Sequence, residues 1–411
     1  MKLILNIAWT HITYRLRQTL VAIAGVMTGV GFSIMMAATM EGMQDDFINR
    51  LVDNLPHISI TDESRAPTQQ PANLVYRATE IHGLVPQVRR PGIKNPMATI
   101  ASLQAWVPGT MTPSVRSKAV LRFAGRNFSV SVIGINPRTE GNVSTLPTHM
   151  RVGTLSSLYR ASNAILLGDS LAAKIGVRIN SNVTLISAWD VTINATVVGT
   201  FHSGLRDTDE TTAYALLRTA QTLENQIGII NEIRIRTREP MGARLISEAI
   251  GEQTGYKSIS WQEAQEDILT SIAKQNIVMY AIVGAILLVA SFGTYNIIST
   301  ITHEKTRDIA IMKSLGFRNQ TIKSIFMIEA LIIGFAGAIA GWALGYLLTY
   351  GMGLIRLSDP LSDAKNIAVM YSAKHYLLAT TVALLSSLVA GYFPARAAAR
   401  LHPVDILRGS T

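Results

Sequence analysis

The chain has 411 residues, 48% of them hydrophobic, and no Cys. Its mean hydropathy is positive and its formal net charge is +10. The apolar residues are bunched in long runs instead of recurring periodically, which excludes a set of ordinary soluble domains and predicts a membrane protein.

Four apolar runs, uncharged apart from Glu329 near the start of the third, reach the length of a bilayer crossing, because about 20 apolar residues suffice to cross the hydrocarbon core. We therefore predict four transmembrane helices, at residues 19–40, 275–302, 327–355 and 376–393. The first run follows a basic segment and ends in small residues, so a cleaved signal peptide is an alternative. Its apolar part exceeds the usual 7 to 15 residues of a signal core, which favours an uncleaved anchor.

The short segments outside the runs predict the orientation. Residues 1–18, 303–326 and 394–411 carry eleven basic residues against three acidic ones, whereas residues 41–274 carry 23 and 21. Basic short loops stay in the cytoplasm. We therefore expect both termini inside, with residues 1–18 as an amphipathic helix, and residues 41–274 and a short loop at 356–375 outside. The basic excess is a topology signal and not a nucleic-acid surface.

The large outside segment shows a mixed pattern. Residues 128–137 and 182–201 are rich in β-branched residues with turns between them, which predicts antiparallel strands. Residues 167–186 predict an Asp or Ser N-cap, a helix, a Gly stop and a strand, and two further helices end in Gly near residues 228 and 255. An α+β domain of over 200 residues buries its own core, so the lack of Cys is compatible with a periplasm-like compartment.

No catalytic or metal-binding pattern stands out in this domain. Its histidines are scattered without the near-neighbour spacing of a metal site, and we interpret them as ordinary polar or buried residues: His57, His82, His149 and His202. Residues 65–73 are expected to form a flexible loop. The segment "HSGLRDTDE" holds a denser charge cluster, Arg206, Asp207, Asp209 and Glu210. It is either a solvated loop or a contact for a periplasmic partner or a sister subunit.

The segment "HEKTRDIAIMKSLGFRNQTIKSIF", residues 303–326, separates the second and third runs. Ile309, Met312 and Leu315 recur at helical spacing, Gly316 is placed to end a short helix, and Asn319 to cap the next. Two helical turns are unstable alone in water, so this helix needs a surface. Lipid headgroups or a cytoplasmic protein could provide that surface. The acidic residues beside the basic ones on this helix favour a protein groove.

The third run contains two further features. Gly337, Gly341 and Gly345 recur every four residues and share a face on which another helix can approach closely. That helix belongs either to the same subunit or to a dimer seam. Glu329 lies near the membrane edge, where it can reach water, and is interpreted as structural.

These blocks resemble a known family along nearly the whole chain. "EKTRDIAIMKSLGF", the tail "FPARAAARLHPVDILRG" and residues 40–60, 132–137, 165–186 and 197–217 are similar to ABC-transporter permeases of the FtsX/MacB/lipoprotein-releasing (LolC/LolE) superfamily, also called type VII or mechanotransmission transporters. In that family the block between spans two and three is the coupling helix that sits on the ATPase. The resemblance implies these coupling residues here: Glu304, Lys305, Arg307, Asp308, Ile309, Met312, Lys313, Leu315 and Gly316.

Two departures from the family pattern bear on function. The lipoprotein-releasing permease that recruits a periplasmic carrier has a long hooked loop after the strand "VTLI", whereas here only "SAWD" separates it from the next strand. Glu329 is closer to what MacB-type exporters carry at that position.

The resemblance implies a multi-pass permease of the bacterial inner membrane. No Gly-Lys dipeptide occurs, so we expect no P-loop and no catalysis or cofactor in this chain, with ATP and Mg²⁺ on a separate ATPase dimer. A second permease copy or homologue and the lipid bilayer are the other expected partners. Release of lipoproteins is the first expectation. The alternatives are a MacB-like pump with a membrane-fusion adaptor and an FtsX-like signalling scaffold.

Overall fold

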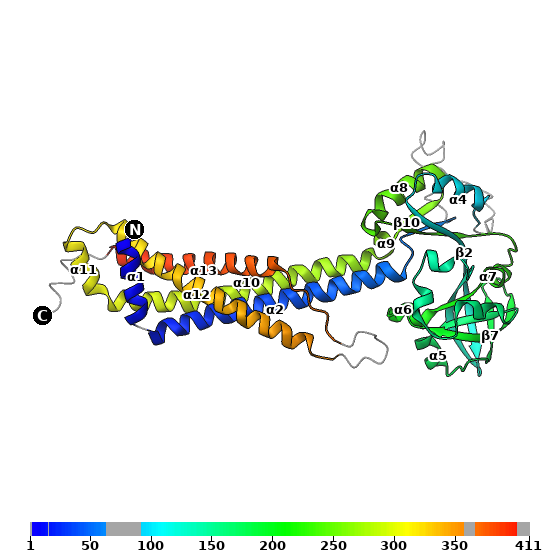
Figure 1. The fold of residues 1–411 in the computed structure, drawn as a ribbon, viewed down its shortest axis with the longest axis horizontal. Helices are drawn as coiled ribbons and strands as arrows, with labels where there is room; N and C mark the ends of the chain where they lie inside the picture. The colour runs from blue at the N-terminus through cyan, green and yellow to red at the C-terminus, as the bar shows by residue number, and fades with distance from the viewer. Residues whose placement is uncertain (1, 15, 63–91, 357–365, 401–411) are drawn as a thin grey trace, which may run out of the picture. The chain divides into compact units, whose positions relative to one another are not determined.

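The computed structural model describes residues 2–14, 16–62, 92–356 and 366–400 (Figure 1). Two compact units are present. One consists of helices and takes in the chain up to residue 46 and from residue 270 onwards, and the other is built on β-sheet and spans residues 47–269. The expected flexible loop at 65–73, His82 and the tail beyond residue 400 lie outside the described residues.

Four helices of the helical unit are long and apolar enough to cross a membrane, as predicted: α2 (Leu16–Asn54), α10 (Glu266–Glu304), α12 (Asn319–Gly353) and α13 (Ala373–Arg400). The predicted span ends at residues 40 and 275 are not helix ends. At 39 residues each, α2 and α10 rise roughly 58 Å, about twice the thickness of the hydrocarbon core. An uncharged run in the sequence ends at the first charged residue, whereas the helix itself continues beyond that residue.

The glycines of α12 pack against α2 of the same chain. An added Cβ at Gly337 would lie 2.6 Å from Cβ of Val26, and one at Gly341 would lie 2.7 Å from Cβ of Val30. Gly345 meets Ile34 in the same way, at 2.9 Å. These three contacts define the glycine seam, and they select packing within the subunit from the two interpretations of the sequence pattern.

One end of the helical unit carries α1 (Lys2–Tyr14) and α11 (Thr306–Ser314) (Figure 1). Ala8 and Ile12 of α1 are buried, whereas Asn6, Thr10 and Thr13 are exposed, so α1 has a buried apolar face and an exposed polar one. Its exposed side also carries Trp9. We call this end of the unit the α11 end.

The opposite end of the helical unit is closed by the backbone that precedes α13. The amide of Met370 donates to the carbonyl of Ala38 at 2.9 Å, and His375 pairs with Glu41. A Cβ at Gly42 would lie 2.7 Å from the Ala368 carbonyl oxygen, so only glycine fits there.

The β-sheet unit has ten described strands. They are β1 (Ile58–Thr61), β2 (Gly109–Phe123), β3 (Arg126–Ile135), β4 (Met150–Val152), β5 (Ala164–Gly168), β6 (Asn182–Ser187), β7 (Thr192–Phe201), β8 (Thr212–Leu216), β9 (Glu232–Thr237) and β10 (Lys257–Ser260). Their order is β10-β1-β9-β2-β3-β8-β5-β7-β4, with β6 pairing both β2 and β7. The strands β2, β3, β8, β5, β7 and β6 thus close into a ring.

The 15-residue strand β2 belongs to both halves of this unit, since its first part pairs with β9 and its second with β3 and β6. Inside the ring, side chains of five strands form one apolar core: Leu121, Val132, Leu167, Leu185 and Val197. The other half packs β1 and β9 under helices α4 (Pro96–Gln104) and α8 (Ala243–Thr254), with Trp261 of α9 (Trp261–Ala264) in the core.

The strand predictions are confirmed only in part. The β6–β7 hairpin is antiparallel, with a tight turn in which the Ser187 amide donates to the Val191 carbonyl at 3.0 Å. The pairs β3–β8 and β5–β7 are parallel, which the sequence pattern did not predict. Helix α5 (Asp169–Ile175) ends at Gly176 and α8 at Gly255, both with positive φ, as expected. The expected Asp or Ser N-cap of α5 is wrong, because Gly168 occupies that position.

Charged side chains are buried where β9 meets β2. Arg234, 2% exposed, donates to Glu140 at 2.8 Å, and Arg116 donates to Glu232 at 3.0 Å. Burial alone would raise the pKa of Glu232, but the nearby Arg116 and Arg234 guanidiniums hold it below its ordinary value. This stabilisation is present above the ordinary carboxyl pKa and is lost as the pH falls through the lowered one.

The glycine seam predicts opposite effects for one substitution at two positions of α12. Gly341→Ala should lower the thermal unfolding midpoint in detergent, because overpacking costs about 1–3 kcal/mol. Gly351→Ala is the matched control, since no described atom lies within 4 Å of its added Cβ and alanine favours the helix. Equal midpoints for the two variants would contradict the seam.

The buried pair predicts a large effect of Glu140→Gln, because it leaves the Arg234 charge buried without its counter-charge. Loss of one partner of a buried pair costs about 3–5 kcal/mol. The control is Glu248→Gln, which removes the exposed pair of Glu248 with Arg244 and should leave stability nearly unchanged. Thermal unfolding of both variants measures the difference, and a control as destabilised as Glu140→Gln would refute this account.

Candidate functional site

Helix α11 is the short helix predicted between the second and third spans. It ends where Gly316 adopts a φ of +94°, with the Gly316 amide donating to Lys313 and the Phe317 amide to Met312. The predicted glycine stop is therefore confirmed. The predicted cap by Asn319 is wrong, because Arg318 takes the N-cap position and Asn319 is the first residue of α12.

The inward face of α11 packs on the chain's own spans. Ile309 and Ala310 are fully buried, and Met312 is partly buried beside them. Their neighbours come from three helices: Ile298 and Ile301 of α10, Ile322, Phe326 and Ala330 of α12, and Ala395 and Ala398 of α13. The spans therefore provide the surface that this helix needs. Ile309 is fully buried and therefore cannot itself contact a partner, whereas the predicted contact of the partly exposed Met312 stays a prediction.

The outward face of α11 is a mixed apolar and charged surface. Arg307, Asp308 and Ile311 are exposed on it, with Leu315 just beyond the last turn. Ile311 is 44% and Leu315 is 74% exposed, although both are large and apolar. Ile311 was not among the residues predicted from the sequence, but its spacing of four residues from both Arg307 and Leu315 would have placed it on this face. We call these four residues the outward face.

The lysines of the segment hold neighbouring helix ends together. Lys305 Nζ lies 2.7 Å from the Asp308 carboxylate and 5.7 Å from the Tyr14 ring centroid of α1. Lys313 Nζ donates to the Ala399 carbonyl of α13 at 2.7 Å. Glu304, the last residue of α10, is exposed. Helix α11 is thus attached to α1 as well as to three spans.

Glu329 departs from its sequence interpretation. Its side chain is fully buried within the helical unit, on the same face of α12 as Phe326 and Ala330. The expectation that it reaches water at the membrane edge is therefore wrong.

The charge cluster in "HSGLRDTDE" forms helix α6 (Arg206–Thr211). Arg206 and Asp207 are exposed, and Glu210 accepts from Arg206 at 2.7 Å and from Lys174 of α5 at 3.0 Å. The hydrogen bond from Arg206 and then that from Lys174 lower the pKa of Glu210. Asp209 is 1% exposed, so its assignment to a partner-contact surface is wrong.

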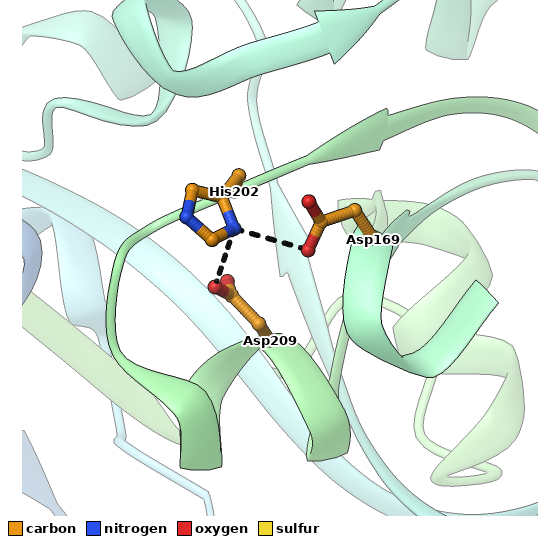
Figure 2. A group of neighbouring side chains, drawn as sticks. All are labelled: Asp169, His202 and Asp209. Carbon is orange, nitrogen blue, oxygen red and sulfur yellow. Dashed lines mark hydrogen bonds and ion pairs between the residues drawn. The ribbon is translucent and has the colours of Figure 1, made fainter. Parts of the chain in front are cut away.

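Asp209 belongs to a buried cluster with His202 and Asp169, shown in Figure 2. His202 Nδ1 lies 3.1 Å from Asp169 Oδ1 and 3.1 Å from Asp209 Oδ2. Burial raises the pKa of Asp209, against the opposing effect of hydrogen bonds from Ser203. No sequence pattern indicated this cluster, because its members are separated by 33 and 7 residues along the chain.

The other described histidines of this unit fit their sequence interpretation. His57 Nδ1 accepts from the Thr237 amide at 3.1 Å, so its Nε2 donates to the Val52 carbonyl. Burial lowers the pKa of His57 and keeps it neutral. His149 lies 3.5 Å from the Thr145 hydroxyl.

Family models match most of the chain. The model of the FtsX-like permease C-terminal region matches residues 280–403, and that of the MacB-like periplasmic core domain matches residues 19–252. The chain is 24% identical over 415 residues to the lipoprotein-releasing system transmembrane protein LolC of Neisseria meningitidis, covering 95% of this chain and 94% of that protein.

A second relative is a longer protein, and this chain covers only part of it. The chain is 22% identical to the macrolide export ATP-binding/permease protein MacB of a Shewanella species, covering 96% of this chain and 58% of that protein. Among solved structures, the periplasmic region of MacB from Actinobacillus actinomycetemcomitans matches 51% of this chain and 91% of its own at 13% identity and a TM-score of 0.31. Because one family model spans more than half of the sequence, the chain belongs to the ABC transporter permeases of the FtsX, MacB and lipoprotein-releasing superfamily.

Proposed function

We propose that this chain is the permease subunit of an ABC complex that releases lipoproteins from the outer leaflet of a bacterial inner membrane. Both termini and α11 face the cytoplasm in this proposal, and the β-sheet unit faces the periplasm. A separate ATPase dimer hydrolyses ATP, and a second permease copy or homologue completes the complex. ATP and Mg²⁺ bind to the ATPase in this proposal, and the permease chain itself hydrolyses no ATP.

The observation that carries the proposal is that α11 has one face buried against the spans and one face exposed. Its inward residues Ile309 and Ala310 are locked among α10, α12 and α13, while the outward face is exposed. A partner bound to the outward face therefore moves a helix that cannot shift without its neighbours, because packed interiors transmit strain. α2 and α10 then carry the motion towards the β-sheet unit as continuous helices.

Lipid-anchored proteins are a suitable cargo for a transporter that uses ATP to drive mechanical motion. Each buried CH₂ of an acyl chain contributes about 0.8 kcal/mol, so extracting a multiply acylated protein needs an external energy source. A groove of about 680 Å³ between α10 and α13 supports the proposal, since its lining is mainly apolar and includes Leu288, Phe292, Leu385 and Phe393. The similarity to LolC along nearly its whole length supports lipoprotein release over macrolide export.

The second candidate is a MacB-like pump that works with a membrane-fusion adaptor. Glu329 in α12 and the β6–β7 turn favour it, since the turn is too short to be the hooked loop of a carrier-recruiting permease. A signalling scaffold of the FtsX kind remains a third candidate, distinguished by the absence of cargo.

The two faces of α11 predict which substitutions weaken its binding to the ATPase. Leu315→Asp and Ile311→Asp should lower the amount of ATPase that co-purifies with the chain by about tenfold, equivalent to about 1.4 kcal/mol. Insertion and yield should stay normal. Ile227→Asp is the matched control, because Ile227 is also 74% exposed but lies in the β-sheet unit.

Ile309→Asp should instead reduce the yield of folded chain, because the charge would be buried among the spans. Normal ATPase association of both outward variants, or no ATPase with the wild-type chain, would overturn the coupling role of α11.

The cargo itself decides between the three candidates. Mass spectrometry of the complex purified in detergent without ATP should find acylated proteins, and ATP should release them. An adaptor in place of acylated protein would show the pump to be correct. A bound periplasmic hydrolase, found without acylated protein and without an adaptor, would show the scaffold to be correct.

A further inference from the structure

We propose that Asp169, His202 and Asp209 bind one divalent transition-metal ion, with Zn²⁺ as the best-matched metal. The three residues come from different elements of the β-sheet unit (Figure 2). Asp169 begins α5, His202 directly follows β7, and Asp209 lies in α6. The site is independent of the transport function.

The donor atoms are already gathered around one point. One ligand atom from each residue lies within 4.8 Å of the other two, and His202 Nδ1 lies 3.1 Å from one oxygen of each carboxylate. Zinc takes imidazole nitrogen and carboxylate oxygen at about 2.0–2.2 Å, so its tetrahedral ligands lie about 3.3–3.6 Å apart. Small side-chain rotations are enough to admit an ion.

One carboxylate oxygen of the cluster is left without a hydrogen bond. Asp209 Oδ1 accepts from the Ser203 amide and hydroxyl, both at 2.8 Å. Asp209 Oδ2 is buried and accepts no hydrogen bond from any residue that the structure describes, although it points at His202. His202 Nδ1 lies equally close, at 3.1 Å, to Asp169 Oδ1 and to this Asp209 oxygen. A buried carboxylate oxygen in this state is costly unless a cation approaches it.

The charge of the cluster favours a divalent ion. Two ionised carboxylates carry a charge of −2, which a divalent ion balances. The nitrogen donor argues against Mg²⁺ and Ca²⁺, which take oxygen ligands. Imidazole with carboxylates suits zinc, and Asp169, which is 30% exposed, leaves a route for the ion and for a water as fourth ligand.

The ion would fasten α6 to its surroundings. The backbone of α6 already lies so close to β5 that a Cβ on Gly168 would be 2.1 Å from the Asp209 carbonyl oxygen. Bound metal would join this helix to α5 and to the end of β7 through a single centre. We therefore expect metal binding to stabilise this part of the β-sheet unit.

The test uses the full-length chain in detergent, purified with a tag that contains no histidine and treated with a chelator. After addition of ZnCl₂ and gel filtration, elemental analysis should find about one Zn²⁺ per chain, as one site requires. Zinc should raise the thermal unfolding midpoint by roughly 4 °C, since it binds the folded state. MgCl₂ at the same concentration should leave the midpoint unchanged.

Asp169→Asn and His202→Gln should each abolish the bound zinc and the shift. Asp169→Asn is the decisive variant, because its partly exposed side chain can lose a charge without unfolding the chain. Asp207→Asn, the same change at an exposed position of α6, should retain both. A zinc content near zero in the wild type, unchanged binding in Asp169→Asn, or an equal shift with MgCl₂ would overturn the site and leave the cluster as an ion pair.

Discussion

A helix of nine residues is too short to persist by itself, so α11 depends on the burial of Ile309 and Ala310 against three longer helices. The rest of the helical unit follows from this contact. α11 is fixed to the spans on one side and exposes Ile311 and Leu315 on the other. A partner that moves α11 must therefore move the ends of the spans or separate a packed apolar core.

The glycine seam also makes the helical unit stiff. Close approach of α12 to α2 at Gly337, Gly341 and Gly345 leaves no room for side chains to rearrange between the two backbones. Packed helices of this kind move as bodies and not by local deformation. The continuation of α2 and α10 past the length of a bilayer gives such motion a direct path along the chain.

The β-sheet unit depends on polar groups that are buried in pairs. Arg234 and Glu140 are held by each other, and Glu232 is held by Arg116. In the cluster of Asp169, His202 and Asp209, the pairing is incomplete, since one buried oxygen of Asp209 has no hydrogen bond from the described residues. The Asp209 oxygen points at His202 and lies beside a second carboxylate, an arrangement that points to a binding role.

The four spans, the shared face of the α12 glycines and the stop of α11 at Gly316 could be predicted from the residues alone, because each depends on residues near one another in the chain. Periodicity shows that a helix has an apolar face but not what covers it. For that reason the packing of Ile309 against the chain's own spans became visible only in the folded chain. The tertiary structure alone also buried Asp209 beside His202 and Asp169, since strands and helices distant in sequence bring these side chains together.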